Sequence, residues 1–243
     1  MKKTYGLLGK NISYSFSASY FKERFEKEKI NASYQNFDLQ NINELREVLK
    51  TNKLHGLNVT IPYKQDVFPF LKQLDPIAQT IGAVNVIKFE NDGSLTGYNS
   101  DFYGFKNSLL PLLKEIPKKA LILGTGGASK AVAYALKSLD IDYTFVSRNK
   151  KENQYTYEEL NQQIIKNNLL IINCTPLGTF PNVDACPNIP YEFITNNHVL
   201  YDLIYNPAET TFLKKGAEKN AITCNGLQML ILQAEKSYEI WNS

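Results

Sequence analysis

The sequence predicts an α/β protein made of two consecutive parts, and three observations lead to this fold class. Segments with the two-residue period of strands alternate along the chain with segments of helical period. The length of 243 residues suffices for one large domain or two small ones. A glycine-rich turn at 124–127 divides the pattern in two. Because strands and helices alternate, we expect parallel sheets.

The first part reads as a small α/β unit that ends near residue 101. Helices are expected at 18–29, 43–51 and 63–74, the last despite Pro69, and a further short element begins at 77–81. Strands are expected at 4–8, 32–39, 56–61, 83–89 and 95–98, the last two forming a hairpin.

The second part begins with a helix at 101–114 and continues the alternation. Its expected strands are 119–123, 143–146, 169–173, 199–203 and 221–223. Its expected helices follow the glycine turn through residue 139 and then occupy 157–164, 210–220 and 226–241.

Composition excludes several classes of function. A formal net charge of +3 with scattered basic residues is too small to indicate a nucleic-acid partner. The longest aliphatic runs are too short to cross a bilayer, so we expect no membrane partner. The three cysteines have no metal-ligand spacing and are odd in number, which favours a reduced cytoplasm and no metal site.

The stretch Gly56–Lys64 is the first candidate for chemistry. Apolar and polar residues alternate through 57–61, and Pro62 then ends the strand. Lys64 therefore lies just past a strand end, where α/β enzymes place functional groups. A lone lysine there is most often a solvated loop residue. The polar segments Gly82–Asn85 and Asn99–Asp101 also end short apolar runs, and they favour a site for a small polar substrate.

The hydroxyl-rich segment after the first strand has two interpretations. Ser17 can cap the following helix by accepting a backbone hydrogen bond. Ser15 and Ser17 can instead donate to a carboxylate or polyhydroxylated ligand, which a helix N-terminus also favours. Both can hold at once.

The glycine turn has the context of a dinucleotide site, because it follows a buried-type strand and precedes a helix. Gly124 permits the tight turn, and Gly126 and Gly127 let backbone N–H groups approach a pyrophosphate. Ser129 stands where the third glycine of the pattern is usual and is still small. A glycine-rich turn that binds nothing is the alternative.

The end of the next strand favours NADPH over NADH. An NAD site usually has an acidic residue there for the ribose hydroxyl, whereas this chain has Ser147-Arg148-Asn149-Lys150-Lys151. Arg148, with Lys150 or Lys151, suits a 2′-phosphate because a guanidinium binds phosphate bidentately. The alternative is a solvated basic loop.

These residues together make the chain resemble the shikimate dehydrogenases over nearly its whole length. The resemblance is carried by segments 15–17, 56–64, 82–85, 97–101, 124–129, 173–178, 201–207 and 225–230. Departures from the family's pattern stand at Ala18, Phe21, Val86 and Gln228.

The resemblance implies a substrate domain at 1–101, a Rossmann-type NADP-binding domain at 102–225, and a C-terminal helix, 226–243, packing back on the substrate domain. It implies the catalytic pair Lys64 and Asp101. The implied substrate-binding residues are Ser15, Ser17, Thr60, Asn85, Tyr205 and Gln233. The implied cofactor-binding residues are Gly124, Gly126, Gly127, Ala128, Ser147, Arg148 and Lys151.

The activity implied is the reversible NADPH-dependent reduction of 3-dehydroshikimate to shikimate, by a monomer or homodimer. Lys64 alone, or the pair with Asp101, would be the acid. An NAD-using quinate/shikimate dehydrogenase is a rival, against which Arg148 argues. A catalytically silent NADPH-binding regulator is another, against which Lys64 and Asp101 argue. A cofactor-free module binding a small carboxylic acid is the third, against which the glycine turn argues.

Overall fold

The computed structural model describes residues 2–13 and 15–243, and the chain divides into two compact units. The first runs to Ser100 and regains Gln233–Ser243, while the second spans Asp101–Leu232. The boundaries expected from sequence were 101 and 226.

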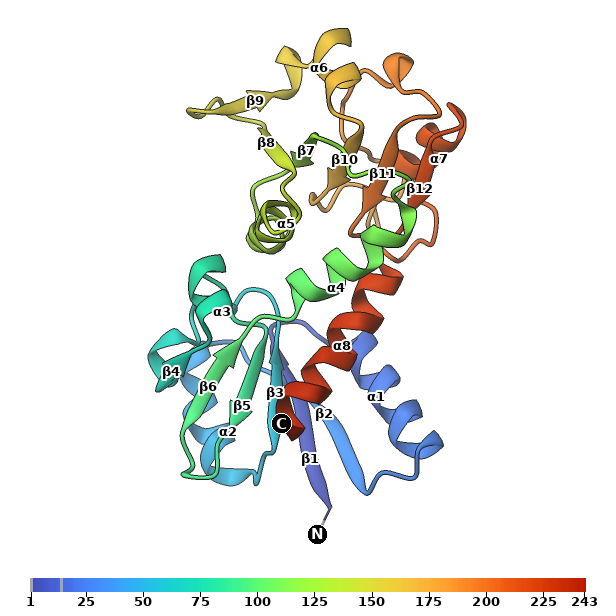
Figure 1. Cartoon of the computed structure of the whole chain (residues 1–243). Helices are drawn as coiled ribbons and strands as arrows, with labels where there is room; N and C mark the ends of the chain where they lie inside the picture. Colours follow the sequence, from blue (N-terminus) through green and yellow to red (C-terminus); the bar gives the residue numbers. More distant parts are fainter. Residues whose placement is uncertain (1, 14) are drawn as a thin grey trace. The chain divides into compact units, whose positions relative to one another are not determined.

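The N-terminal unit is built on a six-stranded sheet in the order β2-β1-β3-β5-β6-β4 (Figure 1). Its strands are β1 (Lys3–Gly9), β2 (Ala32–Asp38), β3 (Gly56–Val59), β4 (Gln73–Leu74), β5 (Val86–Phe89) and β6 (Leu95–Tyr98). Its helices are α1 (Phe16–Lys27), η1 (Ile42–Glu44), α2 (Leu45–Thr51), η2 (Phe68–Phe70) and α3 (Pro76–Ile81).

The sheet of this unit is mixed, whereas the strand–helix alternation alone led us to expect parallel pairing outside the predicted hairpin. Strand β5 pairs antiparallel with both β3 and β6, and only β1–β2, β1–β3 and β4–β6 are parallel. The short turn at 91–94 joins β5 to β6 as a hairpin and leaves no room for a crossover helix, which accounts for the antiparallel pairing of β5 with β6. The predicted hairpin is therefore confirmed.

The helix expected at 63–74 is also wrong. Residues 61–67 form turns, followed by η2 and the two-residue strand β4. The Lys64 carbonyl accepts a hydrogen bond from the Val84 backbone N–H at 2.8 Å, while the Phe68 N–H donates to Gln65 at 3.1 Å. A continuous α-helix would need the Lys64 carbonyl for Phe68. Pro69, which has no N–H to donate, further limits helix growth.

One face of the sheet packs against α1 and the C-terminal helix α8 (Leu227–Asn242). Trp241 stacks on Tyr5 with ring centroids 4.8 Å apart, and its indole N–H donates to the Ile87 carbonyl at 3.1 Å. A Cβ on Gly56 would lie 2.4 Å from the Trp241 ring, so the close approach requires glycine there. The expected return of the C-terminal helix to this domain is confirmed.

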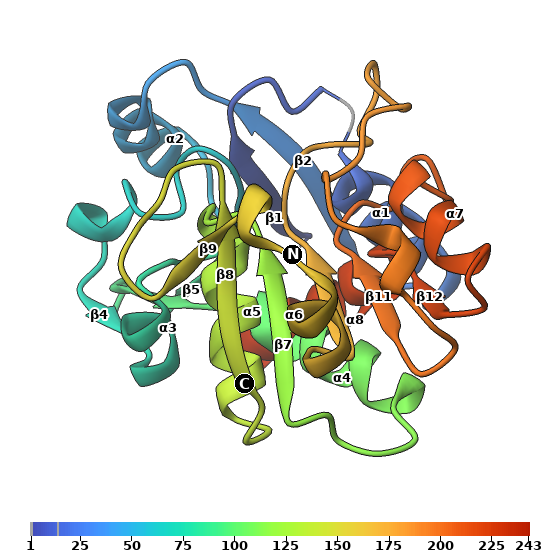
Figure 2. The ribbon, with the colours of Figure 1, turned by 90° about the horizontal axis from the view of Figure 1, so that it is seen from above.

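The second unit contains a six-stranded sheet in the order β12-β11-β10-β7-β8-β9 (Figure 1). Strands β7, β8 and β9 of this sheet can also be followed in Figure 2. All of its neighbouring strands are parallel, as expected. The strands are β7 (Lys119–Leu123), β8 (Asp142–Ser147), β9 (Gln154–Thr156), β10 (Leu170–Asn173), β11 (Val199–Asp202) and β12 (Ile222–Cys224). The helices are α4 (Asp101–Leu109), η3 (Leu110–Leu112), α5 (Gly127–Lys137), η4 (Tyr157–Glu159), α6 (Gln162–Asn167), η5 (Tyr191–Phe193) and α7 (Thr211–Ala217).

The helix expected at 157–164 is wrong, and strand β9 was missed. Two short helices replace the expected one. Glu159 accepts from the Thr156 N–H in a capping box that starts η4, and the Asn161 side chain accepts from the Ile164 N–H and starts α6. Two successive caps set two separate helix starts.

Buried apolar side chains cover both faces of the second sheet. One cluster includes Ile122, Ile172 and Tyr201, and the other includes Leu121, Ile171 and Leu200. Successive residues of β7, β10 and β11 thus point to opposite faces, and both faces are buried. Within residues 2–13 and 15–243, no helix is long and apolar enough to cross a membrane.

Candidate functional site

Polar residues of the N-terminal unit gather at one edge of its sheet. The Thr60 N–H donates to the Leu8 carbonyl at 2.8 Å, which aligns the ends of β3 and β1. The Asn85 backbone bridges both neighbouring strands, because its carbonyl accepts from Val59 at 2.8 Å and its N–H donates to Tyr98 at 3.0 Å. Since β5 runs antiparallel, its start lies at the same edge as the ends of β1, β3 and β6. The structure therefore brings the segments around Thr60 and Asn85 together at one edge of the sheet, whereas the sequence showed only that each follows or begins a strand.

Lys64 stands in the turn that follows β3, and its side chain is half-buried. Its carbonyl is held by Val84, and the Gln65 side-chain amide donates to the Gly82 carbonyl at 3.1 Å. The turn is thus fixed to the segment Gly82–Val84, which directly precedes Asn85. Two separate motifs of the sequence are thus held side by side.

Ser15, not Ser17, is the cap of α1. The Ser15 backbone is extended, with φ −100° and ψ 126°, and its hydroxyl accepts from the Ala18 N–H at 3.3 Å. Ser17 lies in the first turn, where it hydrogen-bonds the buried Tyr34 phenol. Burial raises the pKa of Tyr34 well above its ordinary value, so the phenol stays neutral. Both serines are half-buried at the start of the helix.

Asn85 and Gln233 are directly bonded, as the Asn85 amide nitrogen donates to Gln233 Oε1 at 3.2 Å. Asn85 Oδ1 accepts from the Ser100 N–H at 2.7 Å, and Asn85 Nδ2 donates to Ser100 Oγ at 3.0 Å. Ser100 is completely buried. The bonds fix the orientation of the Asn85 amide and the backbone just before Asp101.

Asp101 and Tyr205 belong to the second unit. Asp101 is the first residue of α4 and is buried, with 4% of its surface exposed. A carboxylate in the first turn is favoured by the helix dipole. Tyr205 lies beyond β11 and is exposed.

The second unit has a cavity of about 430 Å³ at the carboxyl ends of its parallel strands. Gly124 follows β7, Ser147 ends β8 and Cys174 follows β10, so three strand ends converge on it. The cavity is lined by Gly124, Thr125, Gly126, Ser147, Arg148, Tyr157, Cys174, Thr175, Pro176 and Leu177. This is the edge at which open α/β sheets bind ligands.

The glycine turn fits a dinucleotide phosphate. Gly124 has φ +97°, a left-handed conformation that favours glycine, and a Cβ there would lie 3.0 Å from Thr175 Cγ2. A Cβ on Gly126 or Gly127 would meet nothing within 4 Å, so open space lies before these backbone groups. The N-terminus of α5 has no side-chain cap and no acidic residue in its first turn. Its N–H groups and the helix dipole therefore suit an anion.

Arg148 is exposed at the end of β8 and lines the same cavity. Among the described residues, no ion pair involves Arg148 or Lys151, whereas Lys150 Nζ lies 2.6 Å from Glu159 Oε1. Of the two lysines weighed from sequence, Lys150 is therefore engaged elsewhere, and Lys151 is exposed but outside the cavity lining. Ala128 is half-buried in the first turn of α5.

Sequence reasoning missed several lining residues, notably Tyr157 and Thr175. Thr175 is oriented by Asn173, whose Oδ1 accepts from the Thr175 N–H at 3.0 Å and hydroxyl at 2.7 Å. The pattern Asn-x-Thr directly after a buried strand could have signalled this turn. No local pattern marks Tyr157. Burial raises the pKa of the Cys174 thiol, which excludes a thiolate at neutral pH.

Beneath this edge lies a buried carboxyl group, Asp202. It accepts from Thr210 Oγ1 at 2.7 Å and from Asn173 Nδ2 and the Ile204 N–H, both at 3.0 Å. Burial raises the pKa of Asp202 to about 6, against the lowering effect of these hydrogen bonds. The carboxyl group joins the ends of β10 and β11 to the loop before α7.

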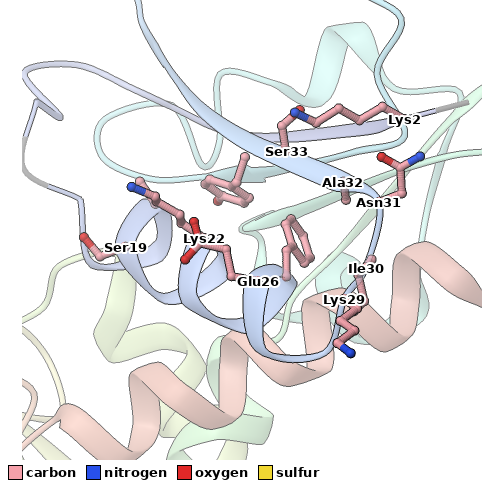
Figure 3. A pocket seen from close by; sticks show the side chains of 12 residues that line it. Lys2, Ser19, Lys22, Glu26, Lys29, Ile30, Asn31, Ala32 and Ser33 are labelled. Atoms are coloured by element: carbon pink, nitrogen blue, oxygen red, sulfur yellow. The ribbon is translucent and has the colours of Figure 1, made fainter.

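A larger hollow of about 730 Å³ lies in the N-terminal unit between α1 and β2 (Figure 3). It contains Lys2, Lys22 and Lys29, but their ammonium groups point in different directions and form no convergent anion site. None of the site residues expected from sequence lines it. No group of His, Cys, Asp and Glu in the described ranges has the arrangement of a metal site.

Comparison with known proteins places the chain in a family. Residues 7–87 match the model of the shikimate dehydrogenase substrate binding domain. The chain is 42% identical to shikimate dehydrogenase (NADP(+)) of Clostridium beijerinckii, with 98% of this chain and 91% of that protein covered.

Solved structures agree with that assignment. Shikimate dehydrogenase of Aquifex aeolicus has a TM-score of 0.88 at 34% identity, covering 99% of this chain and 92% of that one. Shikimate 5-dehydrogenase of Thermus thermophilus, solved with NADP(H) and shikimate, has a TM-score of 0.87 at 27% identity, covering 98% and 93%.

Proposed function

The chain belongs to the shikimate dehydrogenase family, and on that premise we propose that Lys64 and Asp101 carry the proton transfer of its reaction. The activity is the reversible NADPH-dependent reduction of 3-dehydroshikimate to shikimate, a step of aromatic amino acid biosynthesis. The observation that carries it is the similarity to NADP(+)-dependent shikimate dehydrogenases across 98% of the chain.

Lys64 supplies the proton in this proposal. When bound, NADPH supplies the hydride to the C3 carbonyl carbon of the substrate. The oxygen that becomes the alkoxide needs a proton, and the Lys64 ammonium stabilises the developing charge and then donates it. Asp101 orients Lys64 and the substrate hydroxyl. In the reverse direction the same pair accepts the proton.

Substrate recognition falls to the polar edge of the N-terminal unit. Ser15 and Ser17, at the start of α1, donate hydroxyl hydrogen bonds to the ring carboxylate, which the helix N-terminus also favours. Thr60, Asn85 and Gln233 bind ring hydroxyls, and Tyr205 also contributes to substrate binding. The proposal is supported by the bonds that hold Asn85 and the Lys64 turn in place.

NADP binding falls to the cavity of the second unit. The N–H groups of Gly126, Gly127 and Ala128 bind the pyrophosphate, and Gly124 makes the turn that exposes them. Arg148, with Lys151 nearby in sequence, binds the 2′-phosphate, and Ser147 lies beside it. The support is the open space before the two glycines and the position of Arg148 on the same cavity.

The cellular location and the oligomeric state of the protein are also proposals. We propose a cytoplasmic location, supported by three cysteines that are all unpaired. A monomer or a homodimer is the proposed assembly.

The decisive test compares Lys64→Ala with the matched change Lys72→Ala. We expect kcat of Lys64→Ala to fall by about 10²–10⁴, the usual worth of general acid–base catalysis, with unfolding unchanged. Lys72 is exposed and pairs with Asp92 in a surface turn, so its removal should leave turnover intact. Turnover is followed by NADPH absorbance with shikimate and NADP⁺.

Full activity of Lys64→Ala would refute the proposed role of Lys64 as the proton donor, while the chain would still belong to the family. If wild-type protein binds NADPH but turns over neither shikimate nor quinate with either cofactor, the regulator alternative is correct. Turnover mainly with NAD⁺ or quinate would overturn the interpretation of Arg148 or of the substrate residues.

A further inference from the structure

A buried serine of helix α8, Ser237, contacts Ser100, which in turn is bonded to Asn85, one of the two side chains proposed to bind substrate hydroxyls. Its surface is completely inaccessible. Its hydroxyl donates to the Gln233 carbonyl one turn earlier at 2.8 Å, accepts from Asn58 Nδ2 at 2.8 Å, and lies 3.2 Å from Ser100 Oγ. A hydroxyl has one proton and two lone pairs, so these three contacts use its full capacity.

The donors and acceptors of the neighbours fix the direction of each bond. Because Ser237 gives its proton to Gln233, Ser100 must donate to Ser237. Ser100 Oγ in turn accepts from Asn85 Nδ2 at 3.0 Å, and the second proton of that amide goes to Gln233 Oε1 at 3.2 Å. The contacts close a ring of Gln233, Ser237, Ser100 and Asn85.

Asn58 anchors this ring to the sheet. Its Oδ1 accepts from the Tyr34 phenol at 2.8 Å, which leaves its amide nitrogen facing Ser237 and the Asn85 carbonyl. Asn58 is 9% exposed. In a buried site, an amide or hydroxyl without a hydrogen-bond partner is destabilising, because it has lost its contacts with water. The arrangement in which every group of the ring has a partner is therefore the favoured one.

We propose that Ser237 is a positioning residue for substrate binding: it acts through Ser100 on the Asn85 amide and, through Asn85, on the Gln233 side chain. The inference rests on the proposed substrate role of Asn85 and Gln233. With Gln233 Oε1 held as an acceptor of Asn85, the Gln233 Nε2 end is presented for a ligand oxygen. Removing the Ser237 hydroxyl frees the Ser100 proton to turn to Asn85 Oδ1, which lies 3.4 Å away, and so reorients the Asn85 amide.

The test is Ser237→Ala, with Ser108→Ala as the matched control. Ser108 is also a buried helical serine that bonds back to its own helix, at Phe105, and contacts one buried partner, Tyr201 OH, at 2.6 Å. Ser237→Ala should raise KM for shikimate about 3- to 10-fold, the worth of roughly one hydrogen bond, and leave KM for NADP⁺ unchanged. Ser108→Ala should leave both constants unchanged. In an Asn85→Ala background, Ser237→Ala should have little further effect on KM, because both changes act through Asn85 and their effects are therefore non-additive.

An unchanged KM for shikimate in Ser237→Ala would overturn the proposal. The proposal would also be overturned if Ser237→Ala and Ser108→Ala both raised the KM for shikimate and the KM for NADP⁺ to the same extent. If the alanine variant does not fold, Ser237→Cys replaces the hydroxyl by a somewhat larger thiol that hydrogen-bonds only weakly, fills the site and carries the same expectations. The two failures are distinguishable. Absence of wild-type turnover with shikimate refutes the proposed function, whereas normal wild-type turnover with an unaffected Ser237→Ala refutes only this inference.

Discussion

The two units hold their polar strand ends in different ways. In the N-terminal unit, neutral amides and hydroxyls are bonded to one another in the closed ring of Gln233, Ser237, Ser100 and Asn85. In the second unit, a glycine turn presents main-chain N–H groups, and the polar cluster beneath it contains an ionisable group, Asp202.

The difference fits the ligands proposed for the two units, the shikimate ring for the first and the pyrophosphate of NADP for the second. A small ring with several hydroxyls is recognised by side chains of fixed orientation, which a saturated neutral network provides. A pyrophosphate is recognised by backbone N–H groups, which only small residues expose. A further consequence concerns pH. The neutral ring does not titrate near neutrality, whereas the cluster around Asp202 does.

The largest expected effect is a change in the pH dependence of stability in Asp202→Asn. The pKa of Asp202 is raised to about 6 in the folded protein, so between pH 4 and 6 the folded state binds more protons than the unfolded state. Stability must therefore fall as pH rises through this window. About two pKa units correspond to about 3 kcal/mol, and the asparagine variant should lack this decline.

Urea unfolding at a series of pH values measures that contribution. Asp142→Asn, at an exposed position at the start of β8, is the control and should keep the wild-type slope. Identical pH profiles for Asp202→Asn and wild type would contradict the raised pKa and the contrast between the units.

Arg148→Glu should reverse the cofactor preference. An acid replaces the proposed phosphate partner with a group that repels phosphate and can accept from a ribose hydroxyl. We expect kcat/KM for NADPH relative to NADH to fall by about 10²-fold, equivalent to about 2.7 kcal/mol. Lys137→Glu, in the last turn of α5, makes the same charge change away from the cavity and should leave the ratio unaltered. An unchanged ratio in Arg148→Glu would refute its role.

The smallest expected effects concern alanine substitutions at Gly124 and Gly126, which should differ in whether they lower stability or cofactor affinity. Gly126 has φ −76° and ψ −178°, and its Cβ would meet nothing within 4 Å, so Gly126→Ala should fold normally but occupy the space of the phosphate. We expect about a tenfold rise in KM for NADPH. Gly124→Ala meets Thr175 in a left-handed conformation and should lower stability by about 1 kcal/mol or more. Thermal unfolding and cofactor titration check both, and equal stability losses would contradict the distinction.

Sequence by itself determined the features that depend on local order. Alternating periods predicted the α/β class, Asn91-Asp92-Gly93 predicted the hairpin, and the glycines at 124–127 predicted a turn between a strand and a helix, as the structure has it. These signals are local because turn dihedrals and helix starts depend on a few neighbouring residues. The family motifs also select Lys64 and Asp101 as the catalytic pair, which stays a prediction.

Only the tertiary structure decided the rest. The Val84 N–H donates to the Lys64 carbonyl, so the helix expected at 63–74 does not form. Ser15, and not Ser17, caps helix α1. Asn58 and Ser237 bond across 179 positions of sequence, and burial alone raised the pKa of Asp202. Competition for hydrogen-bond partners and removal from water are properties of the folded chain, and no local pattern records them.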